Sequence, residues 1–260
     1  MLTYFRRLWR LYVFSNKRIP YSLWHECLNS TPLLNRLGRK DQRRLRKLAT
    51  LFLHEKTITG AGGLVVDSSM RVCIAAQACV PILNLDLDYY RGWSEIIVYP
   101  TSFIPMRNEL DANGLVHESR RVLDGEAWGR GPVILSWSSI AESMRLGQAS
   151  NVIIHELAHK LDMLNGVANG MPPLHANMTR ENWTKSLSDA FENLEQQLEH
   201  FGYSEIDPYA AESPGEFFAV LSELFFEQPD KLCSVYPRAY EQLRLYYRQD
   251  PMQRDVANAG

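Results

Sequence analysis

The stretch NVIIHELAHKLDMLNG (residues 151–166) constrains the fold most, because it combines a helical apolar pattern with two histidines four residues apart. On a helix turning about 100° per residue, His159 falls about 40° from His155, and Asp162 about 20° away on the other side. Two such imidazoles can bind one tetrahedral Zn²⁺, and Glu156 lies beside them, where it could take a proton from water. The alternative is an ordinary solvated face with two surface histidines. The opposite arc is apolar, with Ile154, Leu157, Ala158, Leu161 and Leu164.

A catalytic zinc site usually has a third protein ligand, and the sequence offers a carboxylate rather than a histidine. The stretch HELAHKLDMLNG departs from the HxxGxxH continuation that would supply another histidine. The segment AAESPGEFFAVLSELFFEQP instead offers glutamates, and Glu223 and Glu227 lie within about 20° of Glu216 on a helix that is otherwise apolar. A buried carboxylate must be paired or bind metal. Glu216 also fits a capping box with Ser213, so both roles are open, and the unfilled third position favours ligation. The fourth glutamate of the segment is Glu212.

The order of elements along the chain indicates an α+β fold that is mostly helical. Helices are expected over 20–60, and SEIIVYPTSF and GPVILSW are short, β-branched stretches that predict strands. Turn signals at Asn113–Gly114 and Asp124–Gly125 suggest a meander between these strands. The strand GPVILSW could also offer an edge to an extended peptide. After a loop around Gly166–Pro173, further helices are expected at about Arg180–Phe201, from near Pro214, and through PRAYEQLRLYYRQD.

These elements suggest an arm followed by one domain. Residues 1–19 form the arm, which is basic and aromatic, and residues 20–260 form the domain. Within the domain, a helical part covers about 20–90, and the sheet with the active-site helices covers about 91–260. The arm could pack on its own domain or lie on a membrane surface. Arginines interrupt its apolar stretch, so a signal peptide is not expected.

Composition narrows the function classes. The 28 basic and 30 acidic side chains leave a net charge of -2, which gives no electrostatic case for binding nucleic acid directly. Stable membrane insertion is not expected, because the chain lacks an apolar run near the ~20 residues needed to span a bilayer. The four cysteines are scattered without a CxxC pair, which predicts reduced thiols in a cytoplasmic protein.

In combination, IIHELAHKLD and DPYAAESPGEFFAVLSELFF resemble the Mlc titration factor A family of zinc-dependent peptidases. IIVYPTSF and GLVHESRRVLDGEAWGRGPVILSW are similar to the family too, and the resemblance runs from about residue 20 to 255. The first 19 residues show no recognisable similarity. The resemblance implies a zincin-like fold, with a small mixed sheet beside the HExxH helix, distantly similar to the catalytic domain of anthrax lethal factor. It also implies a cytosolic location.

By position, the resemblance implies that His155, His159 and Glu216 hold one Zn²⁺ per chain and that Glu156 is the catalytic glutamate. Tyr209 lies seven residues before Glu216. In lethal factor, a tyrosine at the same spacing stabilises the transition state, and the resemblance implies this role for Tyr209. The plain alternative is a tyrosine in a surface turn. The family's activity implies an aminopeptidase-like enzyme acting on peptide or protein substrates. It also implies binding to an Mlc-type transcriptional repressor of sugar uptake.

Two further carboxylates and two rival functions complete these expectations. Asp162 and Glu223 could fix the histidine tautomers from behind, or could form surface ion pairs instead. One rival function is a protein that sequesters a regulator and keeps a vestigial or switch-like zinc site. The other is a metallohydrolase on the same scaffold that acts on a non-peptide amide.

Overall fold

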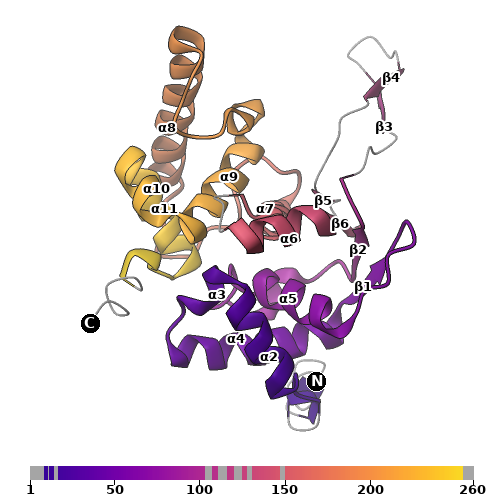
Figure 1. Ribbon diagram of the computed structural model, residues 1–260. Helices are drawn as coiled ribbons and strands as arrows, with labels where there is room; N and C mark the ends of the chain where they lie inside the picture. The colour runs from indigo at the N-terminus through magenta and orange to yellow at the C-terminus, as the bar shows by residue number, and fades with distance from the viewer. Residues whose placement is uncertain are drawn as a thin grey trace.

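The protein is described here by a computed structural model in which helices surround a small sheet (Figure 1). The described residues are 9–10, 12–14, 17–102, 107–110, 116–119, 125–127, 131–146 and 150–253. The expected α+β class, mostly helical with a small mixed sheet, is confirmed. Within the described residues, no helix combines the length and the apolar character that crossing a bilayer requires.

The N-terminal half of the fold is a group of helices that packs on one side of the central helix α7 (Figure 1). The helices expected over 20–60 are present as far as Glu55, but residues 57–60 form a strand instead. Pro32 begins one helix of this half at a first-turn position, and Asp67 caps another. Helix α5 is buried along almost its whole length and contacts α7. The elements are α2 (Tyr21–Ser30), α3 (Pro32–Asn35), α4 (Arg39–Glu55), α5 (Ser68–Ala78) and the 3₁₀ turn η1 (Leu87–Tyr90).

The sheet has four strands in the order β1-β2-β6-β5, in which β1, β2 and β6 are parallel and β5 is antiparallel to β6. The two predicted strands are confirmed as β2 and β6. The predicted meander is confirmed only in part: β3 and β4, and β5 and β6, are antiparallel pairs, but β2 and β6 run parallel, so the strands do not form one continuous meander. The suggested edge role of β6 is wrong, because β6 lies between β2 and β5. The bounds are β1 (Thr57–Gly60), β2 (Glu95–Tyr99), β5 (Gly125–Ala127) and β6 (Val133–Ser136).

Two other features of this region differ from the sequence predictions. Strand β1 was not predicted, because its four residues run directly into the glycine-rich stretch TGAGG (residues 59–63) and offer little periodicity. An antiparallel pair, β3 (Arg107–Leu110) and β4 (Val116–Ser119), stands apart from the main sheet. The Asn113–Gly114 turn lies outside the described residues.

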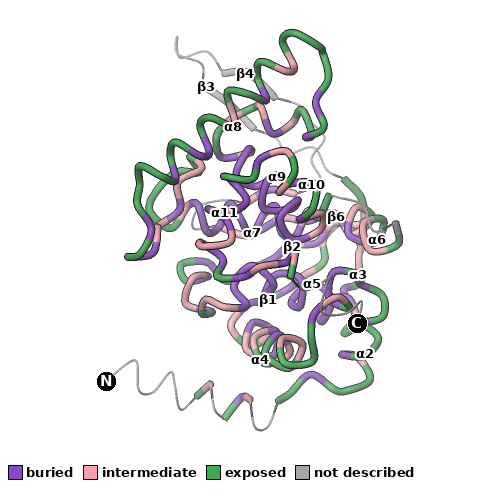
Figure 2. The backbone as a smooth tube through the Cα atoms, turned by 90° about the vertical axis from the view of Figure 1, so that its left-hand side faces the viewer, coloured by how far each residue is buried: buried purple, intermediate pink, exposed green. Residues whose placement is uncertain are grey.

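The C-terminal half places two helices, α7 and α9, in the centre of the molecule, where Figure 2 shows mostly buried backbone. Each begins at a capping side chain: Asn151 accepts from the Ile154 N–H, and Ser213 accepts from the Glu216 N–H. The predicted helices at 180–201, from 214 and near the C-terminus are confirmed. The bounds are α6 (Trp137–Leu146), α7 (Val152–Asp162), η2 (Met163–Asn165), α8 (Arg180–Phe201), η3 (Pro208–Glu212), α9 (Pro214–Glu227), α10 (Pro229–Val235) and α11 (Pro237–Tyr247).

The described part of the N-terminal arm packs on the domain. Arg10 forms ion pairs with Glu55, Asp86 and Asp88 at 3.0, 3.1 and 2.9 Å, and Val13 is buried. These contacts favour the expectation that the arm lies on its own domain. The boundary at residue 19 and the single domain over 20–260 stay predictions.

Candidate metal centre

The polar face of α7 is buried, which contradicts the alternative of a solvated face with two surface histidines. His155 and His159 are 9% and 8% exposed, and Glu156 between them is 4% exposed. Helix α9 packs on this face, Tyr209 of the turn η3 lies over His155, and β5 also packs against α7. Buried imidazoles and carboxylates need partners, so the arrangement of the side chains around this face decides what they can do.

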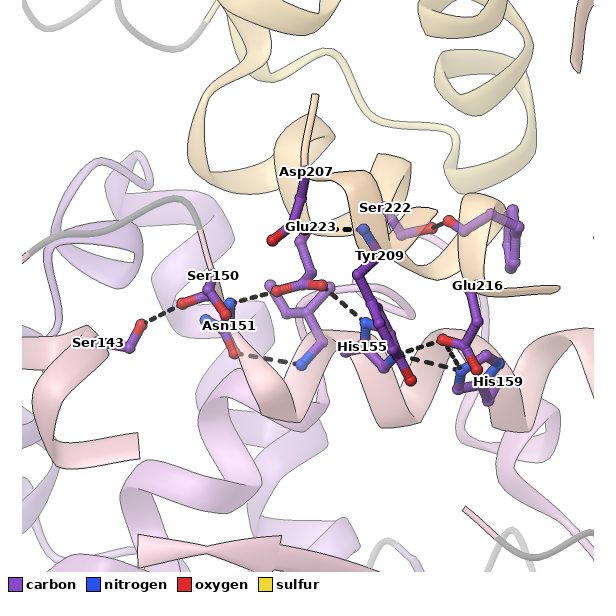
Figure 3. Close-up of polar contacts among 12 residues, drawn as sticks. Ser143, Ser150, Asn151, His155, His159, Asp207, Tyr209, Glu216, Ser222 and Glu223 are labelled. Carbon is purple, nitrogen blue, oxygen red and sulfur yellow. Dashed lines mark hydrogen bonds and ion pairs between the residues drawn. The ribbon is translucent and has the colours of Figure 1, made fainter. Parts of the chain in front are cut away.

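Three ligand atoms from two helices meet above α7 (Figure 3). Glu216 Oε2 lies 3.0 Å from His155 Nε2 and 3.2 Å from His159 Nε2, and the two Nε2 atoms are 3.2 Å apart. Ligands about 2.0–2.1 Å from a tetrahedral zinc are roughly 3.3 Å from each other. The triangle therefore has the size that one small cation in tetrahedral coordination requires.

The sequence left two roles open for Glu216, a bond back to the helix start and a place in a metal site. In the structure its backbone N–H and its carboxylate make different contacts. Its backbone N–H donates to Ser213 Oγ at 3.1 Å, so Ser213 caps α9. Its carboxylate bonds the two histidines instead of serving only the helix start. Burial raises the pKa of Glu216, but hydrogen bonds from His155 and His159 lower it further, to below its usual range. The carboxylate is therefore ionised and available to a metal.

Glu223 holds His155 from behind. Its Oε1 lies 2.7 Å from His155 Nδ1, and its Oε2 accepts from the Asn151 backbone N–H at 2.5 Å. A carboxylate is an acceptor, so Nδ1 carries a hydrogen and donates it to Glu223, which leaves Nε2 as the atom that would bind a metal. Burial lowers the pKa of His155, but its bonds to Glu216 and Glu223 raise it well above its ordinary value. This matches the positioning role that was one expectation for Glu223.

Asp162 has a different role from the one expected. It is fully buried, and its Oδ2 accepts from the Gly170 N–H at 2.7 Å. Trp183 Nε1 donates to the carbonyl of the same glycine at 2.9 Å. Both the N–H and the carbonyl of Gly170, in the loop after α7, are therefore hydrogen-bonded. Within the described structure, Asp162 Oδ1 and His159 Nδ1 are each buried without a hydrogen-bond partner. Asp162 therefore anchors the loop and does not hydrogen-bond the His159 ring.

Glu156 and Tyr209 flank the triangle. Burial raises the pKa of Glu156 to about 7, and its Oε2 is buried without a hydrogen-bond partner in the described structure. The ring of Tyr209 lies over His155, with centroids 5.9 Å apart, and its hydroxyl points to the same side as Glu216 (Figure 3). Asp207 fixes the turn η3 by accepting from the Tyr209 N–H at 2.9 Å. The structure thus brings His155, His159 and Glu216 together, with the Tyr209 ring against His155 and Glu156 next to His155 on the same helix.

Asn151 is a residue of this site that sequence reasoning missed. Besides capping α7, its Nδ2 donates to Gln77 Oε1 at 3.0 Å and to Glu227 Oε1 at 2.8 Å. Glu227 also pairs with Arg36 at 3.3 Å, so the third carboxylate of the α9 stripe serves this network. The signal in the sequence is an Asn directly before the first residue of a predicted helix, a strong N-cap position.

The donor set fits a divalent cation. Two imidazole nitrogens and one carboxylate oxygen form an N₂O set typical of catalytic zinc, which binds imidazole in its neutral form, and the Glu223 carboxylate lies directly behind His155. An HExxH helix beside a small mixed sheet, with a carboxylate supplied by a later helix, defines a zincin-like metallopeptidase.

Comparisons with known proteins place the chain within this class. A family model described as glucose-regulated metallo-peptidase M90 matches residues 5–248, and the chain belongs to that family. The match begins inside the N-terminal arm, where no similarity was recognised. Mlc titration factor A from Yersinia pestis (strain Pestoides F) is 38% identical over 234 residues, which cover 89% of this chain and 86% of the relative. The protein of the same name from Yersinia pseudotuberculosis serotype O:1b has the same identity and coverage.

We expect Glu223→Ala to weaken metal binding about 10–100-fold, because His155 would lose the acceptor that fixes its tautomer and ring orientation. Competition of the purified protein with a chromophoric chelator measures this affinity. Glu205→Ala is the control, since Glu205 is an exposed glutamate elsewhere on the surface. Equal affinities of the two variants would mean that Glu223 does not position His155.

Proposed function

We propose that the protein is a zinc-dependent peptidase in which His155, His159 and Glu216 hold one Zn²⁺ per chain. The observation that carries this proposal is the triangle of ligand atoms, whose sides of 3.0–3.2 Å suit a tetrahedral ion. When bound, the ion supplies a Lewis acid that polarises a carbonyl and acidifies a water. A set of two imidazoles and one carboxylate favours zinc among the metals that bind imidazole and need no redox chemistry.

The proposed work of the protein's own residues is proton transfer and charge stabilisation. Glu156 accepts the proton of the attacking water and passes it to the leaving amine, for which its unpartnered buried Oε2 is suited. Tyr209 donates its hydroxyl hydrogen to the oxygen that becomes negative as the amide is attacked. Glu223 keeps the His155 lone pair directed at the centre. The buried surroundings strengthen each of these interactions, because fewer waters compete for them.

The substrate proposed for this site is a peptide with a free amino terminus, cleaved in the manner of an aminopeptidase. The support is the family resemblance in the motifs together with the position of three carboxylates in and beside the site, those of Glu156, Glu216 and Glu223, which favour a cationic group nearby. We also propose that the protein acts in the cytoplasm, where its four cysteines, all free in the structure, would stay reduced.

Zinc content tests the ligand set. We expect one zinc per wild-type chain after dialysis, and much less than one for His155→Ala and for Glu216→Ala, because a two-ligand site releases the ion. Inductively coupled plasma spectrometry of the purified proteins gives the stoichiometry. Glu199→Ala, which changes an exposed glutamate of α8, should keep the full content. A Glu216→Ala protein with one zinc per chain would leave Glu216 only its place at the start of α9.

Kinetics test the two catalytic roles. On a panel of fluorogenic amino-acid amides, Glu156→Gln should lose activity by about 10²–10⁴-fold, because the amide cannot accept the proton. Tyr209→Phe should lose about 10²–10³-fold in kcat, with KM little changed, because the donor acts on the transition state. Both variants should retain zinc. Full activity in either one removes that residue from the mechanism, and an inactive wild type removes the aminopeptidase proposal.

A second candidate function is titration of a transcriptional repressor of the Mlc type. It is favoured by the name of the relatives, Mlc titration factor A, which share 38% identity with most of this chain. If binding is independent of hydrolysis, an Mlc-type repressor should bind wild type and Glu156→Gln with equal affinity in isothermal titration calorimetry. Absence of binding to both proteins would remove this candidate and leave the peptidase proposal untouched.

A further inference from the structure

Gly125 in strand β5 lies directly against the side chain of Glu156. A Cβ built on Gly125 would lie 2.4 Å from Glu156 Oε1 and 2.7 Å from Glu156 Cγ. It would also lie 2.6 Å from Val152 Cγ2, one turn earlier on α7. These distances are all shorter than a Cβ tolerates, so the carboxyl group of Glu156 occupies the space that any other residue at position 125 would fill.

The backbone does not explain this glycine. Gly125 is not among the glycines with positive φ in the described structure, and it pairs with Leu135 as an ordinary antiparallel residue. The sequence prediction of a turn at Asp124–Gly125 is therefore wrong at Gly125, while Asp124 lies outside the described residues. Because the backbone conformation at position 125 does not require a glycine, the remaining reason for a glycine there is room for the side chain of Glu156.

Strand β5 is the last strand of the described four-stranded sheet, where it pairs with β6 and packs against α7. Its three residues pair in register with β6, and its middle residue, Glu126, is buried. Lys160 of α7 donates to the Gly131 carbonyl at 2.8 Å, which ties the start of β6 to the same helix that carries Glu156. A methyl group at position 125 would therefore displace what is easiest to move, the terminal carboxylate of Glu156.

We propose that Gly125 is a positioning residue for Glu156: the missing side chain leaves a slot between β5 and α7 that fixes the carboxylate beside the ligand triangle. This rests on the proposed role of Glu156 as general base. In the slot the carboxylate keeps one rotamer without needing a hydrogen-bonded partner on the strand. Gly125→Ala closes the slot and turns the carboxylate away from the water that it should deprotonate.

A kinetic cycle tests whether Gly125 acts through Glu156. Gly125→Ala should lower kcat about a hundredfold, the size expected from a misplacement of about 1 Å, with zinc content and KM unchanged. Added to Glu156→Gln, it should cause no further loss, because the base is already gone. A further large loss in the double variant overturns the proposal, since Gly125 would then serve the site by another route. Gly38→Ala is the control, because a Cβ there meets nothing within 4 Å.

A double-mutant cycle on the melting temperature Tm tests the proposal without an activity measurement. All four proteins carry Val152→Ala, which removes the other atom that the new methyl would meet. Gly125→Ala should lower Tm when Glu156 is present, and leave it unchanged or raise it when Glu156→Ala has emptied the slot. An equal loss of Tm in both backgrounds overturns the proposal. If wild type cleaves no substrate, the peptidase proposal fails, and this cycle still shows whether Gly125 and Glu156 share one space.

Discussion

The site depends on one long-range contact, the approach of the Glu216 carboxylate to two imidazoles that lie 61 and 57 residues earlier in the chain. Bringing a charged group into a buried position carries a desolvation penalty of several kcal/mol unless partners offset it. Here α7 and α9, which carry the partners, pack against each other and hold these groups together. The packing of these two helices is thus the structural cause of the metal centre, and the remaining contacts serve to hold that packing in register.

The register of α7 and α9 is set by polar contacts inside an apolar interface. The stripe of Glu216, Glu223 and Glu227 on α9 reaches, in order, the histidine pair, the back of His155, and the Asn151 cap. Apolar packing alone tolerates small slides of one helix along another, whereas three hydrogen-bonded carboxylates at fixed spacing do not. The aromatic residues on the other faces of α9 supply the burial, including Phe217, Phe218, Phe225 and Phe226.

Local periodicity was enough to predict the parts of the site that lie on helices. The spacing of His155 and His159 and the stripe through Glu216 are both properties of a 3.6-residue repeat, and α7 and α9 have the predicted faces. The sheet was harder, because parallel pairing of β1, β2 and β6 joins segments separated by dozens of residues, and no local signal encodes such pairing. Gly125 was misread for the same reason, since its neighbour Glu156 is distant in sequence.

Side chains along α7 contact different parts of the fold, and these contacts explain how the site is preorganised. His155 faces α9, Glu156 faces β5, Lys160 ties down the start of β6, and Asp162 holds the Gly170 loop. A rotation of the helix by even one residue, about 100°, would break all of these contacts together. The orientation of α7 is therefore over-determined by contacts in several directions. Side chains on such a helix hold a fixed geometry, which is what a base and two ligands acting on one centre require.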